Sequence, residues 1–167
     1  MKAPLIQNET DYDGRTVNSI VRWVFKDMEL DGDRVMVKVK HHRGTWAYQG
    51  RFYPHARWQS KEVYSWDRGE YVEVGPRVPA GISHLLVCRI GRPGIYPCQT
   101  HVYKRKDSPG TWEVADWREA LVSITAHEAM HLRQYRTHPK GKRGRFNEVQ
   151  TEWAAFRLWR DWKSKKN

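Results

Sequence analysis

Three residues in the last third of the chain have the types and spacing that metal-assisted hydrolysis requires. His127, Glu128 and His131 read H-E-x-x-H, in a stretch whose apolar residues recur at helical spacing. Two histidines four residues apart on a helix lie one turn apart on the same face, so both imidazoles can bind one zinc ion. Glu128 is turned about 100° around the helix, so its carboxylate can reach a water molecule without filling a coordination position. The pattern predicts a zinc site with Glu128 as the general base.

A catalytic zinc ion usually has three protein ligands and one open position, so the chain should supply one more ligand. Glu148 and Glu152 lie four residues apart, hence on one helical face, in an otherwise basic segment. We expect Glu148 to be the third ligand, and Glu152 to accept a hydrogen bond from the other nitrogen of a ligand histidine. Two alternatives stay open: Glu152 or His138 as the ligand, or both carboxylates as solvated partners of nearby basic side chains.

The motif His127-Glu128-x-x-His131, followed by Asn147-Glu148-x-x-x-Glu152-x-Ala154, resembles the zincin metallopeptidases, and within them the glutamate-zincin branch. In that branch E-x-x-x-D on the following helix gives the third ligand and a supporting acid, and here Glu152 stands where the aspartate would be. The resemblance implies a Zn²⁺-dependent peptidase acting on a polypeptide that pairs with an edge strand. Residues 83–90 or 71–74 are the candidates for that strand.

A second resemblance is to the SprT-like zincins, which are small and basic and take a third histidine as ligand. His138 is the candidate for that histidine, seven residues after His131. Some members of this family act on DNA-bound proteins, so the resemblance implies a protease that works on protein bound to nucleic acid.

The peptidase reaction also needs a donor for the developing oxyanion besides the metal. Tyr135, His138 and Arg145 are the candidates, and none of them lies in a motif. The loop at residues 138–146 carries Lys140, Lys142, Arg143 and Arg145, which either contact phosphates or form a solvated connector.

These residues must be positioned by a small fold, and the period of the apolar residues changes along the chain. The pattern predicts α+β architecture: an N-terminal helix, a small mixed and mostly antiparallel sheet, an active-site helix, and a C-terminal helix with the third ligand. The two strands on either side of Gly44 should form a hairpin, and the tryptophans should pack in the core. The expected helices span residues 15–29, 116–138 and 147–162, and the expected strands span residues 34–41, 45–53, 70–74, 83–90 and 95–103.

Length and composition limit the class of protein. The 167 residues predict a single domain, with a loose lead-in at 1–12 and a basic tail at 163–167. No apolar run approaches the length of a membrane helix, about 20 residues, and the N-terminus does not resemble a signal peptide, which predicts a cytoplasmic protein. Cys88 and Cys98 are expected to be free thiols.

The charge balance supports a second class of function. Lys and Arg number 30 against 19 Asp and Glu, and residues 131–167 contain much of this excess. A basic surface favours nucleic acid or an acidic partner. The alternative to a peptidase is therefore a nucleic-acid-binding protein whose metal site is structural or non-catalytic.

Overall fold

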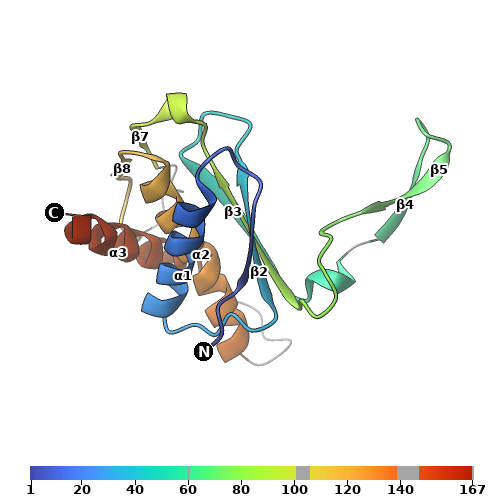
Figure 1. Ribbon diagram of the computed structural model, residues 1–167, viewed down its shortest axis with the longest axis horizontal. Coiled ribbons are helices and arrows are strands. Elements are labelled where there is room, and N and C mark those ends of the chain that lie inside the picture. The colour runs from blue at the N-terminus through green and yellow to red at the C-terminus, as the bar shows by residue number, and fades with distance from the viewer. Residues whose placement is uncertain (60, 101–105, 139–146, 167) are drawn as a thin grey trace.

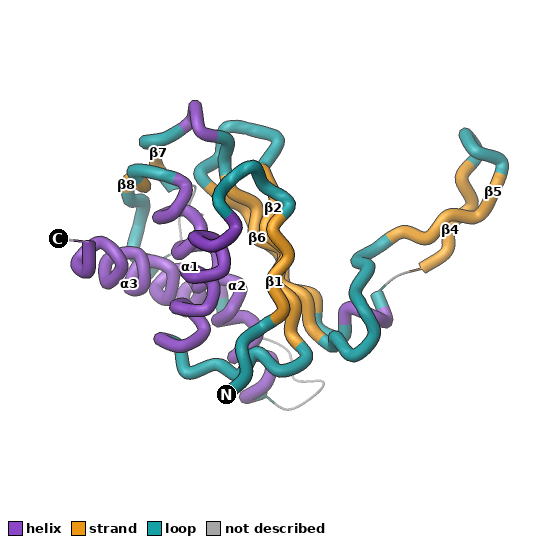
Figure 2. The backbone as a smooth tube through the Cα atoms, viewed as in Figure 1, coloured by secondary structure: helices purple, strands orange, loops and turns teal. Residues whose placement is uncertain are grey.

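A computed structural model describes residues 1–59, 61–100, 106–138 and 147–166. A four-stranded sheet forms one layer, and the helices cover one of its faces (Figures 1 and 2). The mixed α+β architecture predicted from the sequence is confirmed. The helices are α1 (Gly14–Asp27), α2 (Trp117–Thr137) and α3 (Glu148–Lys166).

The four-stranded sheet is mixed, with strand order β1-β2-β6-β3. The first three strands run parallel, and β3 pairs antiparallel with β6. The predicted hairpin between residues 34–41 and 45–53 is wrong, because β6 lies between those two strands. The reason lies in β6, whose almost continuous apolar run is typical of a central strand, whereas β3 alternates polar residues and suits an edge. The strands are β1 (Leu5–Asn8), β2 (Val35–His41), β3 (Tyr48–Tyr53) and β6 (His84–Ile90).

The N-terminal segment belongs to the sheet. Residues 5–8 form β1, and the Glu9 N–H extends the pairing by donating to the Val39 carbonyl at 2.8 Å. The prediction of a loose lead-in at residues 1–12 is therefore wrong. A four-residue strand with one half-buried apolar side chain, Ile6, has too little alternation to be recognised from sequence.

Helix α2 lies against the sheet and is the most buried element of the helical layer. Asp116 caps it by accepting from the N–H groups of Arg118 and Glu119, at 2.9 and 3.0 Å. Its apolar side, including Leu121, Ile124 and Leu132, joins the main core with residues of α1, β2 and β6. Because both faces of α2 are covered, its side chains are held by packing rather than by solvent.

The outer face of the sheet has a smaller apolar cluster at one end only. Met36, Leu85 and Val87 are buried there under Ala56, which belongs to the short helix η1 (Ala56–Trp58). Figure 2 shows no helix over the rest of this face. The two faces therefore differ in what covers them.

A hairpin of strands β4 (Lys61–Ser65) and β5 (Glu70–Val74) stands away from the body (Figure 1). Its aromatic side chains contact one another, with Tyr64 edge-on to Trp66 and to Tyr71. Trp66 is 87% exposed, Trp153 on α3 is 47% exposed and Trp46 is 39% exposed, so the prediction that the tryptophans pack in the core is wrong for these three. The hairpin contains four acidic and two basic residues, so its charge is opposite to that of the chain.

The remaining predictions have mixed outcomes. Of the strand expected at residues 95–103, only β7 (Cys98–Gln99) forms, paired with β8 (Glu113–Val114), and residues 101–103 lie outside the described part. Residues 163–166 continue α3 rather than forming a tail. Cys88 and Cys98 are free thiols, as predicted. None of the helices in the described ranges is long and apolar enough to cross a membrane.

Candidate metal centre

Helix α2 presents His127 and His131 on one face, one turn apart. Their ring centroids are 5.1 Å apart and the rings are nearly perpendicular, at 75°. His131 is buried, and His127 is partly exposed. One of the two imidazoles is therefore enclosed by the protein, and the other keeps partial contact with solvent.

Helix α3 brings Glu148 to both histidines from its first turn. Glu148 Oε2 lies 3.3 Å from His127 Nε2, and Glu148 Oε1 lies 3.2 Å from His131 Nε2. The ligand atoms of the three residues all lie within 4.8 Å of one another. Among the described residues this is the one His, Cys, Asp and Glu group with such geometry. The three residues expected as ligands thus form a single cluster.

The distances within the cluster allow the three side chains to share one metal ion. Zinc bonds of about 2.0–2.1 Å at tetrahedral angles place neighbouring ligand atoms about 3.3–3.4 Å apart. A hydrogen bond between a charged N–H and a carboxylate is shorter, about 2.7–2.9 Å. The observed 3.2 and 3.3 Å lie between these two ranges, so the three groups are close enough either to hydrogen-bond or to share one ion.

Electrostatics in the cluster favour an ionised carboxylate. Hydrogen bonds from His127 and His131 hold the pKa of Glu148 far below its usual range, against the effect of partial burial. Burial opposes protonation of His131, but the Glu148 hydrogen bond and the Glu128 charge outweigh it and raise the pKa of His131. The cluster therefore keeps a negative ligand next to two nitrogen ligands, the donor set that Zn²⁺ accepts.

Gln134 joins His131 to the start of α3, a role that the sequence analysis missed. Its Oε1 accepts from His131 Nδ1 and from the Asn147 N–H, both at 3.2 Å. Its Nε2 donates to the Asn147 carbonyl and to Gln150 Oε1, both at 3.0 Å. Because Nδ1 donates here, a neutral His131 keeps its lone pair on Nε2, the atom that faces Glu148. The position of Gln134, one turn after His131, is the signal that could have indicated it.

Glu128 points from α2 to the sheet, where strand β3 comes very close. A Cβ at Gly50 would lie 2.4 Å from Glu128 Oε1 and 2.6 Å from Ile124 Cδ1, so a side chain at this point of β3 would force Glu128 or Ile124 to shift. Glu128 is 3% exposed, and its Oε2 has no hydrogen-bond partner among the described residues. Burial raises the pKa of this carboxyl, and the Glu148 charge adds to the effect. A buried carboxyl with a raised pKa and a spare oxygen suits proton transfer.

Glu152 lies one turn after Glu148 and is 6% exposed. It is not part of the three-residue cluster. Burial raises the pKa of Tyr48 on β3, and the charge of Glu152 raises it further. Glu152 therefore lies close enough to β3 to affect the ionisation of Tyr48. The expected hydrogen bond from a ligand histidine to Glu152 stays a prediction.

The other candidate residues either make contacts outside the three-residue cluster or lie outside the described ranges. The Tyr135 hydroxyl hydrogen-bonds His55 Nε2, and its ring contacts Phe52 and His84. His138 ends α2, and its Nδ1 lies 2.8 Å from the Gln134 carbonyl, so the cluster forms without it. Residues 139–146 are not described, so the predictions for Lys140, Lys142, Arg143 and Arg145 concern residues outside the structure's description.

The edge strand beside the cluster is β3, which differs from both candidates of the sequence analysis. Residues 83–90 contain β6, which is paired on both sides, and residues 71–74 belong to the projecting hairpin. In contrast, β3 is the last strand of the sheet order and contacts α2 at Glu128. Strand order cannot be read from local patterns, which explains the error.

Comparisons with known proteins add no evidence on the function of this cluster. The chain matches no protein-family profile, no curated protein and no solved structure.

Proposed function

We propose that the chain is a zinc-dependent peptidase of the zincin type. The observation that supports this best is the Glu148 carboxylate, whose two oxygens lie 3.2 and 3.3 Å from the Nε2 atoms of two histidines in an H-E-x-x-H motif. His127, His131 and Glu148 would hold the ion. A zinc ion in such a site supplies Lewis acidity, which lowers the pKa of a water molecule to about 7 and polarises a carbonyl group.

Glu128 is the proposed general base. Its Oε2 has no partner among the described residues, so this oxygen is free to accept the proton of the attacking water. The same carboxyl then donates that proton to the nitrogen of the leaving amine, which completes the transfer without a second acid. Burial raises the pKa of Glu128 above its usual value, which is the direction that suits a group that both accepts and donates a proton.

Strand β3 is the proposed support for the substrate backbone. An extended peptide can add to the free edge of a sheet through main-chain hydrogen bonds. Because Gly50 of β3 lies against Glu128, a peptide on this edge passes close to the proposed base. A backbone interaction of this kind requires a polypeptide but selects few side chains.

Zinc content is the experiment that tests the proposal first. We expect one zinc per chain by elemental analysis of the purified protein, and loss of zinc in His131→Ala and in Glu148→Ala. Glu62→Ala on the projecting hairpin is the matched control, because it removes an exposed carboxylate away from the cluster and should retain zinc. No zinc in the unaltered protein after supplementation, or equal zinc in all variants, would overturn the proposal.

A further inference from the structure

The outer face of the sheet carries basic side chains in register. Val37, Val39 and Cys88 belong to the core under the helices, so their strand neighbours face the other way. Lys40, Arg89 and Gln49 are direct register partners across β2, β6 and β3. One step along, Lys38 and Arg51 flank Val87 in the same manner. Two rows across the open face thus present four cationic side chains.

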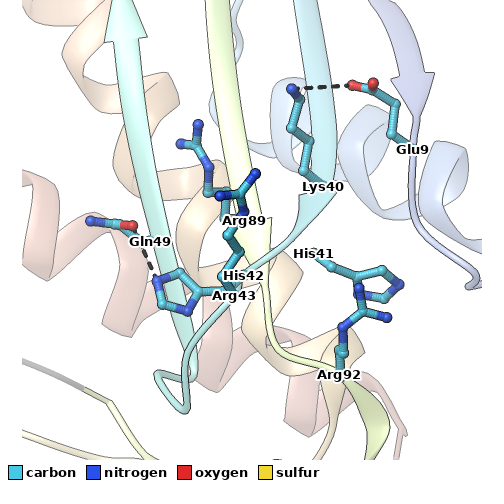
Figure 3. A pocket seen from close by; sticks show the side chains of 8 residues that line it. All are labelled: Glu9, Lys40, His41, His42, Arg43, Gln49, Arg89 and Arg92. Carbon is cyan, nitrogen blue, oxygen red and sulfur yellow. Dashed lines mark hydrogen bonds and ion pairs between the residues drawn. The ribbon is translucent and has the colours of Figure 1, made fainter.

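The row of Lys40, Arg89 and Gln49 lines a hollow of about 480 Å³ (Figure 3). Arg43 and Arg92 line it together with Lys40 and Arg89, and Glu9 is the one carboxylate in its lining. Glu9 lies 3.7 Å from Lys40 Nζ, a long and exposed ion pair that contributes little energy. Arg89 and Arg43 form no ion pair with any carboxylate in the described ranges. The hollow therefore holds an excess of positive charge.

The placement of cations in register destabilises the protein when no anion is bound. Neighbouring strands lie about 4.8 Å apart, so like charges at Lys40 and Arg89 in register repel each other. A bound anion would relieve this repulsion, whereas the protein alone gains nothing from it. The placement of the cations is thus explained better by a ligand than by the stability of the sheet.

An aromatic pair stands at the rim of the hollow. The His42 and Trp46 rings are stacked, with centroids 5.8 Å apart and planes within 6°. Trp46 is 39% exposed, and His42 is also held by Gln49, whose Oε1 lies 3.2 Å from His42 Nε2. Figure 3 shows this hydrogen bond at the side of the hollow. An exposed indole fixed beside a row of cations offers a flat surface on which a base can stack.

We propose that the outer face of the sheet binds single-stranded nucleic acid. The rows of Lys38, Lys40, Arg51 and Arg89 contact the sugar–phosphate backbone, and Trp46 stacks on a base. A cationic track with an aromatic platform is the combination that binds single strands without sequence preference. None of these residues belongs to helix α3, whose last turn is also basic.

Strand β3 connects this face to the metal centre. Gly50 of β3 faces Glu128, whereas Gln49 and Arg51 face the outer side. Nucleic acid on the outer face would therefore lie on the opposite side of β3 from Glu128, a residue of the candidate peptidase site. Binding to the outer face does not depend on catalysis, so the two proposals stand or fall separately.

Fluorescence anisotropy with a labelled oligothymidylate tests the proposal. If four cations each neutralise a phosphate, the affinity should fall about 50-fold between 50 and 200 mM salt. The double variant Lys40→Ala/Arg89→Ala should bind on the order of tenfold more weakly and lose about half of the salt dependence. The matched control is Lys61→Ala/Arg68→Ala on the projecting hairpin, which removes the same charge and should bind like the unaltered protein.

Two further measurements separate stacking and catalysis from charge. Trp46→Ala should weaken binding roughly 5- to 100-fold with an unchanged salt dependence, because a stacked base is lost rather than a phosphate contact. Glu128→Gln should bind the oligonucleotide normally, whether or not the protein is a peptidase. Thermal unfolding of each variant checks the fold, and Lys40→Gln/Arg89→Gln replaces the alanine pair if that pair is unstable.

Four results would overturn the proposal. They are no binding, equal loss of binding in the hairpin control, equal affinity for a duplex of the same length, and equal competition by polyglutamate of matched charge. The third result would assign the surface to duplex nucleic acid, and the fourth to an acidic protein partner.

Discussion

The two faces of the sheet differ in how their charged side chains are compensated. On the helical side, Glu148 lies between two histidines, and Gln134 satisfies the remaining nitrogen of His131. On the outer side, Lys40 and Arg89 are neighbours with one distant carboxylate, Glu9, to offset them. The first arrangement is balanced by residues of the chain itself, whereas the second would be balanced by the anion that we propose binds there.

This difference distinguishes the proposed metal centre from the proposed polyanion-binding surface. A preorganised metal centre is held by hydrogen bonds that fix its ligands before the metal arrives. A surface for a polyanion is held only by the strands beneath it, and its energy is released on contact with the ligand. Alterations on the helical side should therefore disturb chemistry and packing, and alterations on the outer side should disturb affinity for the partner alone.

The largest effect is expected from Glu128→Gln on the helical side. Loss of the proposed base should reduce peptide hydrolysis by about 10²–10⁴-fold, with zinc content unchanged. Quenched fluorescent peptides and elemental analysis measure the two quantities on one preparation. Hydrolysis that persists in the variant would remove Glu128 from the mechanism.

Gln134→Leu should have the next largest effect. Without an acceptor for His131 Nδ1, zinc affinity should fall about 10- to 100-fold, as it does when such supporting groups are lost elsewhere. Competition with a zinc-binding dye measures the affinity directly. Gln134→Glu keeps an acceptor for His131 and should restore most of the affinity, so equal losses in both variants would contradict the proposed role.

Gly50→Ala should destabilise the contact between β3 and α2. Its Cβ would lie 2.4 Å from Glu128 Oε1, and overpacking of this kind costs about 1–3 kcal/mol in the free energy of unfolding. Chemical denaturation measures the change. Gly94→Ala is the control because its Cβ meets no atom within 4 Å, and similar midpoints for both variants would contradict the close approach.

A smaller effect is expected from His84, which lies at the end of β6. Burial, with the nearby charges of Arg136 and His55, lowers the pKa of His84 from 6.5 to about 4. The unfolded chain therefore binds more protons than the folded chain between those pH values, so stability falls as pH drops from 6.5 towards 4. Since His84 is only half-buried, we expect a loss of about 1 kcal/mol after discounting for solvent.

Thermal unfolding against pH measures this loss. His84→Asn keeps an acceptor for the His55 N–H and does not titrate, so its stability should depend less on pH in this range. Parallel curves for the two proteins would contradict the assignment.

The smallest effect is expected on the outer side. Lys40→Gln removes the repulsion with Arg89 and should raise the free energy of unfolding by about 0.2–1 kcal/mol at low salt. The gain should vanish at high salt because exposed charges are screened. Lys61→Gln on the hairpin should show no gain. A loss of stability in Lys40→Gln would mean that its long ion pair with Glu9 outweighs the repulsion.

The helices and the three clustered residues were accessible from the sequence because their signals are local. Asp13 and Asp116 mark helix starts, and a four-residue spacing sets the faces of α2 and α3. The strand order was not accessible, because β6 enters between β2 and β3 from a distant part of the chain. Gln134 and Gly50 were missed for the same reason, since each depends on a partner from another element.

The projecting hairpin should unfold locally while the rest of the molecule stays folded. A two-stranded ribbon that mainly contacts itself is marginally stable, and its amide hydrogens can exchange without disturbing the sheet. Helix α2 and strand β6 are packed from several sides, so their amides exchange only when the whole fold opens. We therefore expect two free energies of opening for amide exchange. The hairpin amides should exchange at a small cost, and the amides of α2 and β6 at a cost equal to the global stability.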